Sequence, residues 1–218
     1  MHLRAALFDL DDTLHDKSAT LRVVAARQYA EANLAALGVS DSRWERAFVE
    51  LNNLRIDKTE VFFRLSQQFG LTTSLQEVLL GDFDANLGSA AVPFPGAAEL
   101  LRMCKSQGIK VGIVTNGRDA FQRSKISGMG LLPFVDAVVT SGAFGVKKPD
   151  PSIFLACLNL LDVQAEHEVF VGDDLSADVE PSLKLGMRAI LKSEATLPGA
   201  WRCAEDLYGV SALIQADA

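Results

Sequence analysis

The segment Leu7-Phe8-Asp9-Leu10-Asp11-Asp12-Thr13-Leu14 places two carboxylates two residues apart at the point where an apolar run ends. If residues 5–8 form a buried strand, Asp9 and Asp11 lie at its carboxyl end, the edge at which open parallel sheets bind ligands. Carboxylates crowded at such an edge repel one another unless a cation or a proton intervenes. The segment therefore predicts a metal site, although residues 11–13 fit an N-cap and an acidic first helical turn equally well.

The composition is that of an ordinary globular protein. With 218 residues, of which 49% are hydrophobic and 22% charged, the chain can bury the core of one domain plus a moderate insertion. The net charge of −7 and the lack of a dense Lys/Arg run argue against nucleic acid or an anionic membrane as the partner. No apolar run approaches the roughly 20 residues that a membrane-spanning helix needs.

Cysteine usage and the start of the chain bear on location. Cys104, Cys157 and Cys203 are odd in number and lack the spacing of a zinc site or a disulfide framework, so reduced thiols are the simplest interpretation. The first expected strand begins within a few residues of Met1, which leaves no room for an export signal. We therefore expect a cytoplasmic protein; the sequence predicts no oligomeric state.

From about residue 94 onward, short apolar runs alternate with helical patterns, as in the β-α units of a parallel sheet. The expected helices are residues 96–106, 118–127, 151–161, 179–185 and 204–214, and the expected strands are residues 110–114, 137–140, 169–171 and 188–191. With the strand at residues 5–8, these elements predict a Rossmann-like α/β core built on a parallel sheet.

Residues 17 to about 90 interrupt this alternation, because no β-branched run occurs there and apolar residues recur at helical spacing. The expected helix faces are Leu21, Ala25, Tyr29 and Ala30; Trp44, Phe48 and Leu51; Val61, Phe62, Leu65 and Phe69; and Leu75, Val78, Leu79 and Phe83. An all-helical insert directly after the first strand predicts a lid. We expect a core of residues 1–16 and 91–218, an inserted all-helical cap of residues 17–90, and hinges at residues 13–17 and 88–95.

A second strand end, Ile113-Val114-Thr115-Asn116-Gly117, carries a hydroxyl and a turn. The Thr115 hydroxyl can donate a hydrogen bond, and backbone N–H groups of a turn that opens a helix can bind an anion. An ordinary strand, turn and N-cap explain this segment at least as well when it is taken alone.

Two later segments also place a polar residue at the end of an expected strand or at the start of an expected helix. Lys148 precedes Pro149, which restricts it to an extended conformation at the start of an expected helix. Asp173 follows Gly172 at the end of another apolar run. A surface lysine and a helix cap explain each one alone, but four strand ends carrying Asp, Thr, Lys and Asp in this order predict one pocket for a nucleophile, a metal ion and a phosphate group.

The segments FDLDDTL, IVTNG, KKPDP and VGDD resemble the four motifs of hydrolases of the haloacid dehalogenase superfamily. The helical insert between the first two motifs resembles the C1-type cap of the first subfamily. The resemblance covers essentially the whole chain, and the ordered set is highly specific although each motif is weak alone. It implies a Mg²⁺-dependent phosphatase of small phosphorylated metabolites that acts through an aspartyl-phosphate.

The resemblance also implies catalytic and phosphate-binding roles. Asp9 would be the nucleophile that attacks phosphorus, and Asp11 would protonate the leaving oxygen and then activate water. Thr115 and Lys148, with Asn116 in the turn, would hold the phosphoryl oxygens. In the family the chain turns helically after the first motif residue, which would bring Asp9 and Asp11 to the phosphate from different sides.

The implied metal site has hard oxygen ligands. Mg²⁺ would bind the Asp9 carboxylate, the Asp11 main-chain carbonyl and Asp173, a set suited to that ion. Asp174 and Asp178 are interpreted as residues that orient these ligands from behind.

Several other functions compete with this interpretation. A 2-haloacid dehalogenase attacks carbon and needs neither Mg²⁺ nor an acid two residues on, so Asp11 argues against it. A phosphonoacetaldehyde hydrolase would need a cap lysine, for which Lys58 is the candidate, and a phosphomutase would need a cap that shields the aspartyl-phosphate; both stay open. A receiver-type signalling domain has its acidic groups in a different order, and a non-catalytic phosphate-binding protein would not need the full catalytic set.

Substrate choice is expected in the cap, because the core motifs contact only the phosphate. The candidate residues are Arg22, Asn53, Arg55 and Lys58, with Arg118 at the rim of the core. Ordinary helix-surface charge is the alternative interpretation of each.

Overall fold

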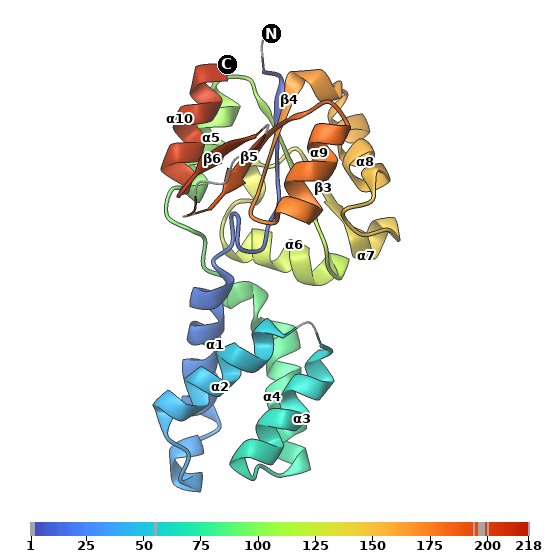
Figure 1. Ribbon diagram of the computed structural model, residues 1–218. Helices are drawn as coiled ribbons and strands as arrows, with labels where there is room; N and C mark the ends of the chain where they lie inside the picture. Colours follow the sequence, from blue (N-terminus) through green and yellow to red (C-terminus); the bar gives the residue numbers. More distant parts are fainter. Residues whose placement is uncertain (1–2, 55, 194, 196–198, 200, 218) are drawn as a thin grey trace. The chain divides into compact units, whose positions relative to one another are not determined.

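The computed structural model describes residues 3–54, 56–193, 195, 199 and 201–217. The chain divides into two compact units, one formed by Met1–Asp16 with Pro93–Ala218 and the other by Lys17–Val92. The first unit contains the sheet and its helices, and the second consists of the helices coloured blue to green in Figure 1. That the two units act as catalytic core and cap stays a prediction.

Within the described residues, six parallel strands form one sheet in the order β3-β2-β1-β4-β5-β6. They are β1 (Ala5–Phe8), β2 (Lys110–Thr115), β3 (Ala137–Thr140), β4 (Glu168–Gly172), β5 (Arg188–Lys192) and β6 (Arg202–Ala204). Strand β1 is paired on both sides, with Phe8 opposite Ile113 of β2 and Val171 of β4. The residues that follow β1, β2 and β4 therefore meet at one edge of the sheet.

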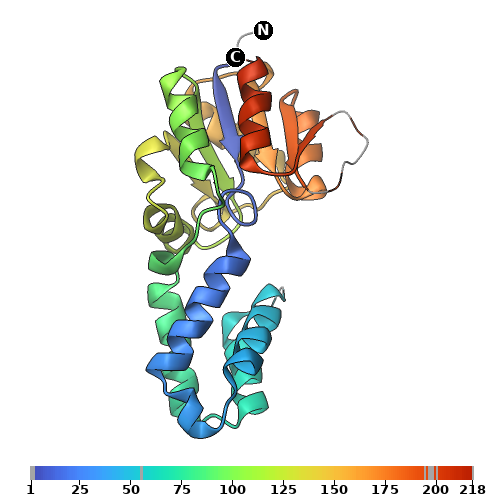
Figure 2. The same cartoon turned by 90° about the vertical axis from the view of Figure 1, so that its left-hand side faces the viewer.

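Helices cover both faces of this sheet (Figures 1 and 2). Helices α5 (Ala97–Ser106) and α10 (Leu207–Asp217) pack together on one face, and α8 (Pro151–Leu161) and α9 (Glu180–Lys184) lie on the other. The remaining helical segments of the unit are α6 (Asp119–Gly128), α7 (Ser141–Phe144), the short turns η3 (Leu132–Phe134) and η4 (Ala165–His167), and the π-helical segment η5 (Leu175–Val179). The chain is thus an α/β protein with a Rossmann-like core.

Helix α8 packs onto β2 and β3, and its Phe154 also reaches β4. The rings of Phe154 and Phe170 meet edge to face with centroids 5.0 Å apart. Gly112 lies under Cys157, and a Cβ atom added to this glycine would lie only 2.7 Å from the Cys157 sulfur. This close approach explains why a glycine occupies the middle of an otherwise apolar strand.

The strands expected from the sequence are confirmed to within one residue at each end. The last expected helix is wrong at its start, because residues 202–204 form the edge strand β6 and α10 begins only at Leu207. The expected helix at residues 179–185 is confirmed as α9, and η5 precedes it.

The described part of the second unit contains the helices α1 (Lys17–Glu31), α2 (Asp41–Asn53), α3 (Lys58–Phe69) and α4 (Thr73–Asn86), with the turns η1 (Leu34–Leu37) and η2 (Gly88–Ala90). Its core is aromatic: the ring of Phe48 lies 5.7 Å from that of Trp44 and 6.0 Å from that of Phe62. Val78 was expected in this core but is 62% exposed, because Leu79 and Phe83 occupy the buried stripe of α4.

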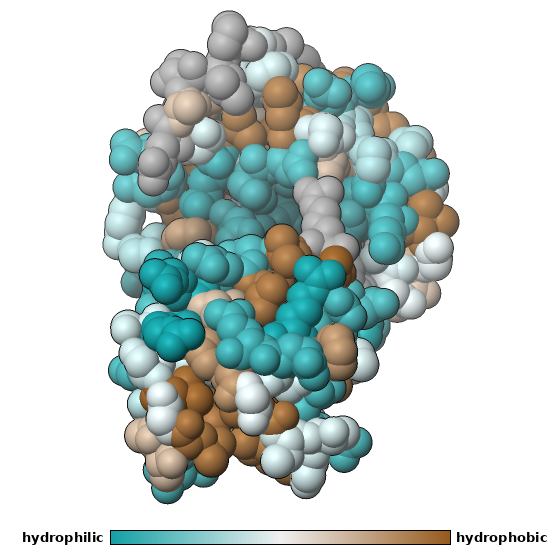
Figure 3. Space-filling model, turned by 60° about the horizontal axis from the view of Figure 1, so that its bottom comes forward, coloured by the Kyte–Doolittle hydropathy of each residue, from teal (hydrophilic) through white to brown (hydrophobic). Residues whose placement is uncertain are grey.

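Exposed apolar side chains are spread over both units. Figure 3 shows one face of the molecule, on which hydrophobic residues (brown) are interspersed among hydrophilic ones (teal). Such single exposed residues are ordinary in soluble proteins. Among the residues described, every helix is too short or too polar to span a bilayer.

Candidate active site

The carboxyl edge of the sheet brings together the residues that the sequence singled out. Asp9 directly follows β1, and its N–H donates to the Val171 carbonyl of β4 at 2.9 Å. Thr115 is the last residue of β2, and Asp173 directly follows β4. These three strands are neighbours, so their ends deliver a hydroxyl and two carboxylates to one place.

The chain turns sharply after Asp9. Asp12 has a left-handed backbone conformation with φ of 63°, and the His15 N–H donates to the Leu10 carbonyl at 2.8 Å. Because the backbone leaves the strand here, Asp11 is not carried on the same face as Asp9. The turn directs its carboxylate toward α6 instead.

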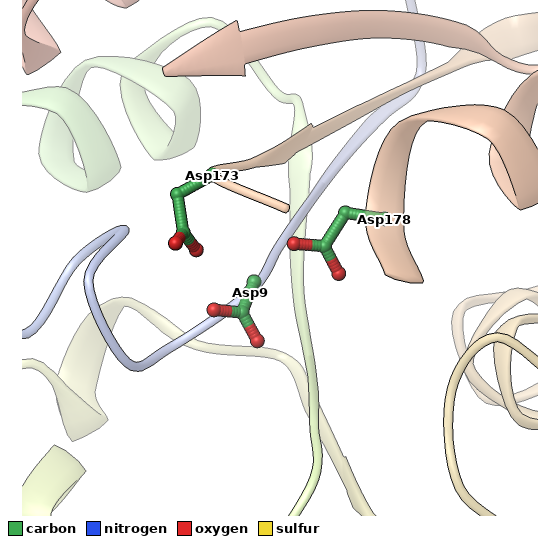
Figure 4. A group of neighbouring side chains, drawn as sticks. All are labelled: Asp9, Asp173 and Asp178. Atoms are coloured by element: carbon green, nitrogen blue, oxygen red, sulfur yellow. The ribbon is translucent and has the colours of Figure 1, made fainter. Parts of the chain in front are cut away.

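Asp9, Asp173 and Asp178 form a carboxylate cluster. Each contributes an oxygen, and these oxygens all lie within 4.8 Å of one another. Figure 4 shows the three side chains converging from the end of β1, the end of β4 and η5. Burial, opposed by the Lys148 ammonium, raises the pKa of Asp9 from 3.8 to about 7. Burial and the charge of Asp9 raise the pKa of Asp173 to about 6, so the cluster favours a cation or protons.

Lys148 is a buried cation beside this cluster. Its Nζ donates to Oδ1 of Asp9 at 2.5 Å and to Oδ1 of Asp178 at 2.6 Å. Burial acts to lower its pKa, but the charges of the two carboxylates outweigh burial and the pKa is raised. The ammonium therefore stays charged beside the predicted nucleophile.

The Asn116 side chain fixes the backbone that presents Lys148. Its Oδ1 accepts from the Lys148 N–H at 2.8 Å, and its Nδ2 donates to the Lys148 carbonyl at 3.1 Å. The Asn116 amide is thus occupied by the Lys148 backbone. Its expected contribution to phosphate binding, which concerned backbone N–H groups of the turn, stays a prediction.

Asp11 lies outside the carboxylate cluster and is held by three side chains. Lys125 Nζ donates to both carboxylate oxygens at 2.7 and 2.9 Å, Gln122 Nε2 donates to Oδ2 at 3.0 Å, and His15 Nδ1 lies 2.6 Å from Oδ1. Burial acts to raise the pKa of Asp11, but the Lys125 charge and His15 outweigh it and hold the pKa well below its usual range. The Asp11 main-chain carbonyl stays a predicted metal ligand.

Asp174 and Asp178 differ in position, although the sequence assigned both the same supporting role. Asp174 caps η5, accepting from the Ser176 and Ala177 N–H groups at 2.9 and 3.0 Å. Asp178 reaches into the carboxylate cluster, where burial raises its pKa. Its position makes it a candidate metal ligand as well as an orienting residue.

Sequence reasoning missed the partners of these residues: Thr13, whose hydroxyl donates to Asp173 at 3.1 Å, and His15, Gln122 and Lys125 around Asp11. A signal for two of them was present. Gln122 and Lys125 are spaced i, i+3 on a helix expected to follow a catalytic strand end, and they share its buried face with Ile126. Polar residues on the buried face of a helix next to a strand end are thus a sequence signal for a functional site.

The expected substrate residues lie in different settings. Arg22 is exposed on α1, with Nε 3.7 Å from Oε1 of Glu45. Lys58 donates to the Asn52 carbonyl at 3.2 Å and to its Oδ1 at 2.8 Å. Arg118 is the N-cap of α6, Asn53 is exposed at the end of α2, and Arg55 lies outside the described residues. Their role in substrate choice stays a prediction.

Comparisons of the sequence and the fold with known proteins all point to the same family of hydrolases. The family model of haloacid dehalogenase-like hydrolases matches residues 3–186. The glyceraldehyde 3-phosphate phosphatase of Methanocaldococcus jannaschii is 29% identical over 216 residues, covering 94% of this chain and 89% of the relative. The phosphoglycolate phosphatase of Rhodospirillum rubrum is 28% identical over 195 residues, covering 87% and 79%. The crystal structure of a HAD phosphatase from Thermococcus onnurineus aligns with a TM-score of 0.66 at 28% identity, covering 97% of this chain and 98% of that one.

Proposed function

Because the chain belongs to the haloacid dehalogenase-like hydrolase family, we propose that it is a Mg²⁺-dependent phosphatase of small phosphorylated metabolites with Asp9 as its nucleophile. The observation that carries the proposal is the placement of buried Asp9, 6% exposed, between the Lys148 ammonium and a carboxylate cluster at the carboxyl edge of the sheet. Two similar proteins named as phosphatases support the same chemistry.

The residues of the cluster fit a magnesium ion. Three carboxylates with oxygens within 4.8 Å of one another, two of them with a raised pKa near 6 or 7, are short of positive charge. Asp9 and Asp173 would hold the ion with the Asp11 carbonyl, and Asp178 is placed to join them. The bound ion would neutralise charge on the phosphoryl oxygens.

The first half of the reaction forms a covalent intermediate. An Asp9 carboxylate oxygen attacks phosphorus in line as the bond between phosphorus and the leaving oxygen breaks. Asp11, whose pKa Lys125 and His15 hold low, must first take up a proton, which it then gives to that oxygen. Lys148, 2.5 Å from Oδ1 of Asp9, would hold a phosphoryl oxygen and offset the negative charge of the phosphoryl group in the transition state. The product alcohol departs and leaves an aspartyl-phosphate.

The second half returns the enzyme to its starting state. The Asp11 carboxylate takes a proton from a water molecule, whose oxygen attacks phosphorus on the side opposite Asp9. The acyl-phosphate bond breaks, inorganic phosphate leaves and the Asp9 carboxylate is regenerated. The Thr115 hydroxyl, at the end of β2, would hold a phosphoryl oxygen in both steps.

The substrate is proposed to be a small phosphate monoester. The names of the relatives put glyceraldehyde 3-phosphate and phosphoglycolate first in a substrate panel, to be tested with other sugar phosphates and nucleoside monophosphates. A cytoplasmic location, expected from the cysteines, is proposed with it.

The test is phosphate release from p-nitrophenyl phosphate with Mg²⁺. Asp9→Asn removes the nucleophile and should abolish turnover, whereas Glu60→Gln, which alters an exposed carboxylate paired with Arg64 on α3, should leave it intact. Acid quenching with a radiolabelled phosphate ester should trap label on the wild-type protein only. Wild-type-like turnover by the Asp9→Asn variant would reject the proposal, and transfer of the phosphoryl group to a second sugar instead of water would indicate a phosphomutase.

A further inference from the structure

Lys125 is a buried cation that the reaction described above leaves without a role. Its side chain, on α6, is only 6% exposed, whereas the Asp11 side chain that it contacts is 30% exposed. The ammonium donates to both oxygens of this carboxylate, at 2.7 and 2.9 Å. The lysine therefore binds the Asp11 carboxylate from the protein interior, while the carboxylate stays partly exposed to solvent.

Gln122, one helical turn earlier, connects the same carboxylate to the end of β2. Its Nε2 lies 3.0 Å from Oδ2 of Asp11, 2.7 Å from Oγ1 of Thr115 and 3.2 Å from the Asn116 carbonyl, so its two hydrogens are shared among three acceptors. The residue is 1% exposed. A Cβ atom on Gly117 would lie 2.9 Å from the Gln122 side-chain carbonyl carbon, so this side chain has little room to move.

Stability alone does not account for this arrangement. An ion pair with a buried lysine gains little over a well-packed apolar residue, because taking the ammonium out of water costs about as much as its attraction to the carboxylate returns. A methionine in place of Lys125 would fill the same space without that cost. What the pair supplies is a fixed direction for the carboxylate, set by two donors on one rigid helix.

We propose that Lys125 and Gln122 are positioning residues. Through these two side chains, α6 fixes the Asp11 carboxylate relative to the Thr115 hydroxyl, so that the acid and the phosphate-binding hydroxyl reach the same phosphoryl group. The inference rests on the proposed phosphatase function. A loss of Asp11 positioning should be visible as a dependence of the rate on the leaving group. A nitrophenolate departs without help from an acid, whereas an alkoxide needs the proton that Asp11 delivers.

The experiment compares kcat/KM for p-nitrophenyl phosphate with kcat/KM for an alkyl phosphate that the wild type hydrolyses. This parameter covers the steps up to formation of the aspartyl-phosphate. Lys125→Met also raises the pKa of Asp11, because it removes a positive charge beside that carboxylate. Loss of the carboxylate's position should outweigh this, so kcat/KM should fall at least about tenfold more for the alkyl ester than for the aryl ester, since general acid catalysis contributes typically 10²–10⁴-fold. Lys125→Arg, which keeps the charge, should restore most of that selective loss.

Two further variants keep the test decisive. Lys105→Met removes an exposed ion pair with Asp136 at 2.5 Å and should show no dependence on the leaving group. Gln122→Met should repeat the selective loss and also raise KM, because it releases Thr115 as well; it decides the question if Lys125→Met does not fold. Equal losses on both esters, or a selective gain on the alkyl ester, overturn the inference while leaving the phosphatase proposal intact. A wild type without turnover overturns both.

Discussion

Replacing Lys148 with methionine removes the ammonium that two buried carboxylates share. The Nζ atom donates to Asp9 at 2.5 Å and to Asp178 at 2.6 Å, and all three side chains are buried. Methionine has nearly the same length, so the change removes charge with little change in packing. The carboxylates would remain in place without this cation.

The expected cost follows from burial. Removing one partner of a buried ion pair typically destabilises a protein by about 3–5 kcal/mol, because the remaining charge is left uncompensated. Here the carboxylates can also take up protons: burial raises the pKa of Asp9 to about 7 even with the lysine present. We therefore expect the full cost of about 3–5 kcal/mol near pH 8 and a smaller cost near pH 5, where protons replace the missing cation.

The assay is urea denaturation followed by circular dichroism at pH 8 and pH 5, with a chelator and with Mg²⁺. Mg²⁺ should stabilise the Lys148→Met variant at pH 8, because a bound cation compensates the same carboxylates. Adding Asp178→Asn to the variant should recover part of the stability, since one of the unpaired charges is then gone.

The matched control is Lys105→Met, which removes an ion pair whose lysine side chain is 40% exposed and which should cost at most about 1 kcal/mol. The free energy of unfolding of the Lys148→Met variant at pH 8 without metal could instead lie within about 1 kcal/mol of the wild-type value. In that case the carboxylates do not need a positive charge, and the reasoning for the metal site fails.

Three other predictions concern separate features. Burial raises the pKa of Glu168 from 4.5 to about 8, so the folded protein holds a proton that the unfolded chain releases. This group should lower the free energy of unfolding by up to about 1.4 kcal/mol per pH unit between pH 5 and 8, and Glu168→Gln should remove that contribution from the slope in denaturation curves, leaving the contributions of Asp9 and Asp173. Gly112→Ala should destabilise the protein by about 1–3 kcal/mol, because the new methyl group collides with Cys157. Adding Cys157→Ala to this variant should recover part of the lost stability in thermal melts, and no recovery would contradict the packing described. Thr13→Val removes the hydroxyl that donates to Asp173 at 3.1 Å and should weaken Mg²⁺ binding about 10-fold or more by calorimetry; unchanged affinity would show that this contact does not orient a ligand.

The sequence was sufficient for five of the six described strands and for the residues that lie at the carboxyl edge of the sheet. Asp9, Thr115 and Asp173 each follow a short apolar run, and parallel strands bring such positions together whatever the connecting segments do. The edge strand β6 was not foreseen, because Arg202–Ala204 is short and pairs with β5 on one side only. Its existence depends on a neighbour rather than on its own residues.

The sequence indicates that Gln122 and Lys125 share a helix face, but not that this face meets Asp11. A left-handed Asp12 turns the chain after β1 and sends Asp11 toward α6. A regular strand would have put it on the same face as Asp9. Lys125 and Gln122 look like ordinary surface residues of an amphipathic helix until that turn is known. The spacing of apolar residues predicts which side chains share a helix face, but it does not predict which residue of another segment that face contacts.

The position of β1 in the sheet has a consequence for how the protein is made. Strand β1, which Asp9 follows, pairs with β2, more than 100 residues later in the chain, and with β4, more than 160 residues later. The helical unit between them, Lys17–Val92, contains its own aromatic core and is complete before β2 leaves the ribosome. A nascent chain that stops short of Asp173 therefore carries the nucleophile without the carboxylate cluster, and catalytic competence arises late in translation.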